Sequence, residues 1–179
     1  DTTPCIKDYR GNDPHKWDPC GTSFPTCKIN AEDDDWFEGE CKFHENVLSQ
    51  NCGRQFEWFE RNMRKYTSED LIVVIGHNPA YEIDVDNRYM SLLNESFVDL
   101  YLNGHVHLLG AYDLNPYAKT TKFITTGAGS MVNINLKNNT TNKVNLKLNQ
   151  QLYVWRETIA GFTRHKINWS KREILTEFI

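Results

Sequence analysis

The sequence has no long apolar run, no excess of positive charge and no closely spaced pair of cysteines. No stretch approaches the roughly 20 apolar residues of a membrane-spanning helix, so we expect no membrane span in this chain. Lys and Arg number 20 against 24 Asp and Glu, and the resulting net charge of −4 does not favour nucleic-acid binding. The length of 179 residues, of which 39% are hydrophobic, is typical of one globular domain.

Several catalytic motifs are also missing. The sequence contains no H-E-x-x-H, no G-x-S-x-G and no P-loop lysine pattern, which argues against zincin proteases, serine α/β-hydrolases and P-loop nucleotide enzymes. No basic stripe accompanies the aromatic residues, so we expect four of the tryptophans to be core residues rather than stacking platforms: Trp36, Trp58, Trp155 and Trp169.

All cysteines lie in the first third of the chain, at positions 5, 20, 27, 41 and 52. Residues 5–52 are rich in Pro, Gly, Asp and Asn, and they are predicted to form an insertion closed by disulfides, as in an oxidising compartment. A reduced zinc cluster is the less favoured alternative, because no short C-x-x-C pair is present. Five is an odd number, so one thiol is free or pairs outside this chain. Candidate glycosylation sequons also indicate the secretory pathway, and they begin at Asn94, Asn138, Asn139 and Asn168.

The hydrophobic pattern predicts alternating helices and strands, and therefore an α/β fold. Leu71–Ile75 is a continuous β-branched run of the kind found in strands buried on both faces. Residues 133–150 are rich in Asn and Lys and are predicted to be a loop. The expected helices span residues 55–66 and 88–97, and the expected strands span 71–75, 98–102, 108–112, 122–126, 152–157, 161–167 and 173–179.

Three predicted strands each end in a glycine-containing turn: GHNP at 76–79, NGHVH at 103–107 and TTGAGS at 125–130. Ligands of open α/β sheets bind at the carboxyl ends of strands. His105 and His107 can point to the same side because side chains alternate along an extended backbone, and His77 can converge on them. Three imidazoles around one point favour a transition-metal site. The glycines of TTGAGS are expected to let the backbone approach this site closely, whereas His15, His44 and His165 are assigned no function.

The ordered motifs resemble one known family. DTTP at residues 1–4, the helix around Phe56, the strand with GHNP, the segment VDLYLNGHVH and the turn TTGAGS follow one another as in purple acid phosphatases. These enzymes are the tartrate-resistant branch of the calcineurin-like metallophosphoesterases. The resemblance covers residues 1–4 and 53–130, and more loosely 152–179, but not the cysteine-rich insertion.

This resemblance implies an αββα sandwich of two mixed sheets flanked by helices. It also implies a binuclear centre of Fe(III) with Fe(II), Zn(II) or Mn(II), at which a metal-bound hydroxide attacks a phosphate monoester. His77 and His105 look like ligands of the divalent ion, and His107 looks like a ligand of the ferric ion.

The sequence departs from the family pattern at three points. Val106 replaces the usual Asp between the paired histidines, and Tyr81-Glu82-Ile83-Asp84 lacks a further histidine that often follows GHNP. The family's G-D-x-x-Y and G-N-H motifs, which carry the remaining ligands, are absent. We therefore expect residues 1–179 to be the C-terminal part of one phosphoesterase domain that needs an N-terminal half and is inactive alone. The alternative is a catalytically silent relative that uses the fold for binding or anchoring.

Overall fold

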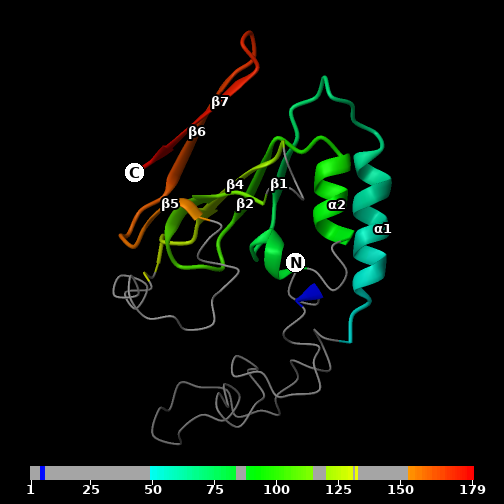
Figure 1. The fold of residues 1–179 in the computed structure, drawn as a ribbon, viewed down its shortest axis with the longest axis horizontal. Coiled ribbons are helices and arrows are strands. Elements are labelled where there is room, and N and C mark those ends of the chain that lie inside the picture. The colour runs from blue at the N-terminus through cyan, green and yellow to red at the C-terminus, as the bar shows by residue number, and fades with distance from the viewer. Residues whose placement is uncertain (1–4, 7–48, 84–87, 115–119, 131, 133–152) are drawn as a thin grey trace, which may run out of the picture.

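The computed structural model describes residues 5–6, 49–83, 88–114, 120–130, 132 and 153–179, which form a mixed α/β fold (Figure 1). The sequence predictions for DTTP, for most of the cysteine-rich insertion and for the loop at 133–150 lie outside these residues. Each predicted helix and strand has a counterpart. The strand at 122–126 has the predicted bounds, and the bounds of the others are shifted. The elements are α1 (Cys52–Met63), β1 (Val73–Ile75), a 3₁₀ turn (Ala80–Glu82), α2 (Arg88–Glu95), β2 (Leu100–Asn103), β3 (Leu109–Tyr112), β4 (Lys122–Thr126), β5 (Tyr153–Glu157), β6 (Thr163–Asn168) and β7 (Glu173–Phe178).

The main sheet has five strands in the order β1-β2-β4-β3-β5. Strands β1, β2 and β4 are parallel neighbours, whereas β3 is antiparallel to both β4 and β5. The antiparallel pair β6–β7 forms a separate two-stranded sheet (Figure 1). A mixed α/β fold was predicted correctly, while the αββα sandwich stays a prediction.

One face of the main sheet carries the aromatic core. A row of three aromatic residues crosses the middle of the sheet. The register pairs Tyr101 of β2 with Phe123 of β4, and Phe123 with Tyr112 of β3. The ring of Phe123 lies 5.8 Å from that of Tyr101 and 5.0 Å from that of Tyr112. Tyr89 of α2 packs on Tyr101 with ring centroids 6.1 Å apart, so this face of the sheet is covered by helix.

Helix α1 is fixed at its start and packs on α2. Asn51 caps the helix by accepting a hydrogen bond from the backbone N–H of Arg54. A disulfide joins Cys52, the first helical residue, to Cys5, which is fully buried. Phe56 and Phe59 fall on one face and contact Tyr89, as their helical spacing predicted. This bridge agrees with the expectation of disulfides in the cysteine-rich segment.

The prediction that Leu71–Ile75 is buried on both faces was wrong. Strand β1 is the edge of the sheet, and only Val74 packs against the core. Val73 and Ile75 point to the opposite face, where they are 40% and 78% exposed. A continuous apolar run has the same sequence signature in a central strand and in an edge strand, so the pattern alone could not separate them.

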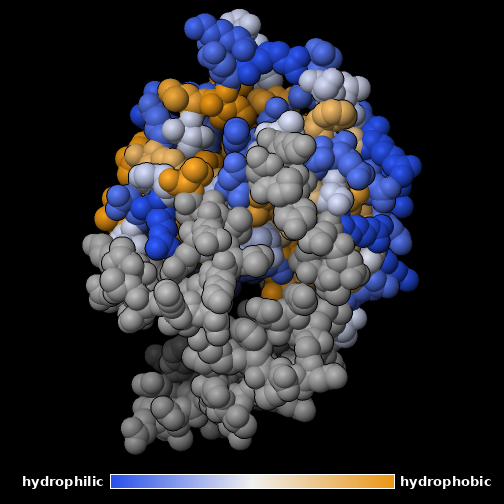
Figure 2. Space-filling model, in the orientation of Figure 1, coloured by the Kyte–Doolittle hydropathy of each residue, from blue (hydrophilic) through white to orange (hydrophobic). Residues whose placement is uncertain are grey.

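Several aromatic residues that we assigned to the core are exposed. Trp58 lies on the solvent side of α1, and Trp155 and Trp169 are also exposed. Phe97, assigned to the apolar face of the second helix, follows the end of α2 with φ of 54° and is exposed. Its left-handed backbone terminates the helix, a position that favours glycine on steric grounds. Hydrophobic residues are visible over the β5–β7 side in Figure 2, while the surface over α1 is hydrophilic.

None of the helices within the described ranges has the length and apolar character that a bilayer crossing requires.

Tyr89 is expected to set an alkaline limit on stability. Burial raises the pKa of its hydroxyl from 10.0 to about 12, and the hydrogen bond with Tyr101 only partly offsets this effect. A pKa raised by folding contributes stability that is complete below pH 10 and is lost as the pH rises toward 12. The full loss is about 3 kcal/mol. Urea unfolding between about pH 9 and 12 should show this decline. Tyr89→Phe should make it shallower, and the remainder is due to Tyr101, because burial also raises the pKa of the Tyr101 hydroxyl. The exposed Tyr66→Phe is the control and should leave the decline intact.

Candidate metal-binding histidine site

The carboxyl ends of three strands meet at one edge of the main sheet, as predicted. Strands β1, β2 and β4 are parallel and adjacent. The turns that follow them, GHNP, NGHVH and TTGAGS, therefore lie together at this edge. Parallel strands aligned in this way place the histidines of the first two turns within reach of one another.

Backbone hydrogen bonds fix the NGHVH turn on the GHNP turn. The carbonyl oxygen of His77 accepts from the backbone N–H groups of Gly104 and His105, with N···O distances of 3.0 and 2.8 Å. The N–H of Gly76 donates to the carbonyl of Leu102 at 2.9 Å and so extends the β1–β2 ladder into the turn. The positions of both histidine backbones are thus set by the main chain.

Gly127 allows the third turn to approach the histidine turn. A Cβ atom added at Gly127 would overlap the carbonyl oxygens of Gly104 and Val106. Only a residue without a side chain fits between these two backbone groups. The prediction that a glycine of TTGAGS permits close backbone approach is confirmed.

The side chains of His77 and His105 are in contact. Nδ1 of His105 lies 3.1 Å from Nε2 of His77, and the rings meet edge-on with centroids 5.0 Å apart and an interplanar angle of 72°. Burial lowers the pKa of His105, and the charges of His77 and His107 lower it further. Both effects favour the neutral form of His105, in which a ring nitrogen can bind a cation.

The pair fits two positions in the coordination sphere of one metal ion. Two nitrogens each about 2.0–2.1 Å from one ion, at octahedral or tetrahedral angles, are about 2.9–3.4 Å apart. Among the residues described here, no group of three or more His, Cys, Asp or Glu side chains is arranged to hold a metal. The structure thus brings His77 and His105 together. The charge of His107 contributes to the lowered pKa of His105. That all three histidines bind one metal stays a prediction.

An acidic side chain stands beside the histidine pair. Oε2 of Glu82 lies 3.9 Å from Nε2 of His105 and accepts a hydrogen bond of 3.3 Å from the side-chain amide of Asn78. The 3₁₀ turn that carries Glu82 follows GHNP directly. A carboxylate here attracts a cation and repels a phosphate dianion.

A buried polar network that we did not predict supports both turns. The amide of Asn103 donates to the hydroxyl of Tyr112 at 3.1 Å and to the carbonyl of Ile124 at 3.2 Å. The Thr125 hydroxyl donates to Oδ1 of Asn103 at 3.0 Å. The Tyr101 hydroxyl donates to the carbonyl of Asn78 at 2.7 Å. Nothing in the sequence separates these residues from ordinary strand residues, because their partners lie on other strands.

The remaining candidate residues are scattered. Asn94 lies in α2 and is partly buried, whereas Asn168 is exposed at the end of β6. Oδ1 of Asn168 accepts from the hydroxyl of Ser170 at 2.9 Å. Asn138 and Asn139 lie outside the described residues, as do His15 and His44. The ring of His165 lies between the hydroxyls of Thr163 and Thr176 in the β6–β7 sheet.

Comparison with protein-family models gave no match, and comparison with curated proteins gave none either. One similar solved structure is described as GAP50, the anchor in the inner membrane complex of Plasmodium. It is 20% identical to this chain, with a TM-score of 0.51. The match covers 75% of this chain and 39% of the GAP50 chain. At this identity the likeness concerns the fold alone.

Proposed function

We propose that the histidine site belongs to a metal-dependent acid phosphatase acting on phosphate monoesters, as the resemblance to purple acid phosphatases implies. The observation that carries the proposal is the 3.1 Å separation between Nδ1 of His105 and Nε2 of His77, the spacing of two ligands of one ion. His77 and His105 would hold a metal, with His107 as the next candidate. The metal would supply Lewis acidity to activate water and to stabilise charge on the phosphoryl group.

The chain's own residues would orient these ligands. The shared hydrogen bonds to the His77 carbonyl hold the two imidazole-bearing turns in register. Asn103 anchors the end of β2 to β4 and to Tyr112, so the NGHVH turn starts from a fixed point. Groups that orient ligands in this way affect metal affinity nearly as much as the ligands themselves.

The proposal includes further ligands from polypeptide beyond this chain. Neutral imidazoles carry no charge to offset two multivalent cations, which would repel each other strongly without a bridging carboxylate. The exposed side chain of Ile75 supports this part of the proposal, because an apolar residue on one face of a sheet is normally covered by a second layer of the fold. The missing part would complete the αββα sandwich and its binuclear iron centre, with Fe(II), Zn(II) or Mn(II) as the second ion.

We place the protein in the secretory pathway, either secreted or in an acidic lysosomal or vacuolar compartment. The Cys5–Cys52 disulfide supports an oxidising compartment.

Metal binding tests the proposal without relying on activity. Residues 1–179 are expected to bind at most one Co²⁺ ion, detected through its visible absorption bands and by calorimetric titration. His77→Ala and His105→Ala should each weaken binding at least about tenfold, because each removes a ligand. His165→Ala is the control and should leave the affinity unchanged.

The same protein should not hydrolyse p-nitrophenyl phosphate with added iron and zinc. Unchanged Co²⁺ binding in both the His77 and the His105 variants would refute the metal assignment. Robust hydrolysis abolished by His105→Ala would instead refute the requirement for further polypeptide.

A second candidate is a catalytically silent relative that uses the fold for binding or anchoring. Two observations favour it: the carboxylate of Glu82 near His105 opposes phosphate, and the structurally similar GAP50 is described as an anchor. Absence of Co²⁺ binding in a longer protein that carries the remaining family motifs would select this candidate.

A further inference from the structure

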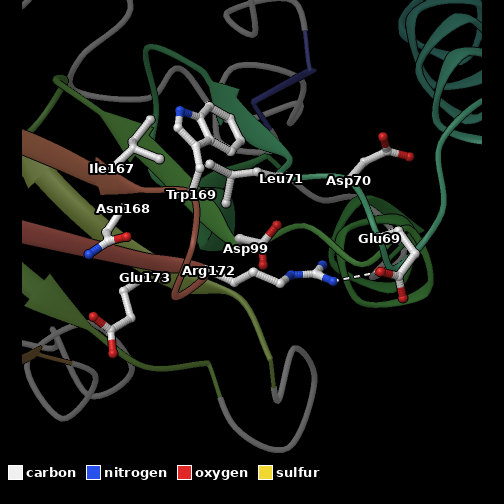
Figure 3. A pocket seen from close by; sticks show the side chains of 9 residues that line it. All are labelled: Glu69, Asp70, Leu71, Asp99, Ile167, Asn168, Trp169, Arg172 and Glu173. Atoms are coloured by element: carbon white, nitrogen blue, oxygen red, sulfur yellow. Dashed lines mark hydrogen bonds and ion pairs between the residues drawn. The ribbon is translucent and has the colours of Figure 1, made fainter.

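A groove lies at the end of the sheet opposite the histidine site. Its inner pocket, of approximately 200 Å³, lies between the β6–β7 turn and the segment that leads from α1 to β1 (Figure 3). A shallower hollow of approximately 440 Å³ shares Leu71 and Trp169 with this pocket and continues past Val73 to the end of α1. Leu71 precedes β1 and Val73 is its first residue, whereas His77 follows its carboxyl-terminal end.

One long-range ion pair holds the two walls of the pocket together. Arg172, in the β6–β7 turn, donates to Oε2 of Glu69 at 2.8 Å and to the carbonyl of Ser68 at 2.6 Å. Figure 3 shows the guanidinium reaching from the turn to Glu69. Arg172 has φ of 54°, a backbone conformation that costs energy in a non-glycine residue and persists only where the surroundings enforce it. The Arg172 side chain thus links the β6–β7 turn to the segment before β1.

The lining of the pocket is strongly acidic. Four carboxylates line it, and the single guanidinium among them is already engaged by Glu69 and a carbonyl, so the local charge is 1 minus 4, or −3. Such a site favours cationic groups and repels phosphates and carboxylates. The four acidic residues are Glu69, Asp70, Asp99 and Glu173.

An exposed tryptophan stands at the junction of the two hollows. Trp169 is 71% exposed, and the partly exposed Ile167 and Tyr66 extend the apolar surface around it. Exposed tryptophans are the residues most enriched among the dominant contacts of protein interfaces. The face of an indole also attracts guanidinium and ammonium groups.

We propose that this groove docks a basic polypeptide segment of a partner protein. One arginine or lysine side chain enters the acidic pocket against the indole of Trp169, and neighbouring apolar side chains lie along the hollow toward Tyr66. The charge of −3 favours a positively charged partner segment. The inner pocket, of approximately 200 Å³, has room for one long side chain, and the hollow of approximately 440 Å³ beside it has room for the residues that flank it. The inference is independent of the histidine site.

A fluorescent decapeptide of alternating arginine and leucine is the probe, and binding to residues 1–179 is measured by fluorescence anisotropy. Bacterial expression leaves Asn168, which lines the pocket, without a glycan. Trp169→Ala is expected to weaken binding at least about tenfold, as for a dominant interface residue. Glu173→Gln should weaken it about threefold and should reduce the dependence of affinity on salt.

Two matched variants separate the groove from the general surface. Trp58→Ala removes an exposed tryptophan on α1, and Glu157→Gln removes an exposed carboxylate on β5, both outside the groove. Neither should change the affinity. Circular dichroism of each variant establishes that the fold is retained.

Four outcomes would overturn the proposal. They are absence of saturable binding, equal binding of an aspartate–leucine decapeptide, equal loss of affinity in Trp58→Ala and Trp169→Ala, and self-association. In the last case, sedimentation would show a dimer that Trp169→Ala dissociates, and the groove would belong to a second copy of the chain.

Discussion

Gly127→Ala is expected to lower the free energy of unfolding by about 3 kcal/mol, the upper end of the usual cost of overpacking. The added methyl group meets the carbonyl oxygens of Gly104 and Val106, which are backbone atoms and cannot rotate away. The turn that carries His105 must therefore move, or β4 must shift at its end. Urea unfolding followed by tryptophan fluorescence measures the loss.

Gly129→Ala is the matched control for this substitution. It lies two residues further along the same turn, and a Cβ there has no neighbouring atom within 4 Å. Its expected effect is within about 0.5 kcal/mol, as for a surface substitution. Equal destabilisation by the two variants would show that flexibility of the turn, and not the contact with the histidine turn, determines the cost.

Phe123→Ala is expected to destabilise the fold still more, by about 3–5 kcal/mol. Phe123 is 1% exposed and occupies the centre of the aromatic row, in contact with the rings of Tyr101 and Tyr112. Its truncation removes apolar burial and leaves a cavity that two tyrosines, held by their hydroxyl hydrogen bonds, cannot fill. A loss of this size is a large fraction of the about 5–15 kcal/mol that stabilises a typical domain.

Two comparisons isolate the packing effect at this position. Phe123→Leu retains most of the apolar volume and should cost clearly less than the alanine variant. Phe162→Ala removes the same ring from an exposed position and should change stability by no more than about 0.5 kcal/mol. Similar unfolding midpoints for Phe123→Ala and Phe162→Ala would contradict the assignment of the core to the aromatic row.

The contact between His77 and His105 could be anticipated because it depends on local signals. Each histidine directly follows a glycine at the end of an apolar run. Parallel pairing of the neighbouring strands then brings the two turns together. The need for glycine at position 127 was predictable for the same reason. Helical spacing predicted an apolar stripe of Phe56, Phe59, Met63 and Tyr66, widened by Trp58. Phe56 and Phe59 are buried as predicted, whereas Tyr66 and Trp58 are exposed.

The features that could not be predicted depend on contacts between segments that are far apart in the sequence. Ile75 belongs to a run that looks buried on both faces, but its exposure depends on whether another element packs on its face of the sheet. We assigned Trp169 to the core because tryptophan side chains are usually buried. The residue itself does not indicate that it lies in an exposed hairpin turn. The pairing of Arg172 with Glu69 spans 103 residues, and no local pattern indicates it.

The strand order also determines when the sheet can assemble during synthesis on a ribosome. Strand β3 has β4 and β5 as its two neighbours, and both are translated after it. A nascent chain that ends before Lys122 therefore presents β3 with both edges open, while β1 and β2 can already pair. Leu109 and Tyr112, which are buried in the finished protein, are uncovered during that interval. Unpaired apolar strands are prone to aggregate, so β3 is exposed to that risk until β4 and β5 have left the ribosome and paired with it.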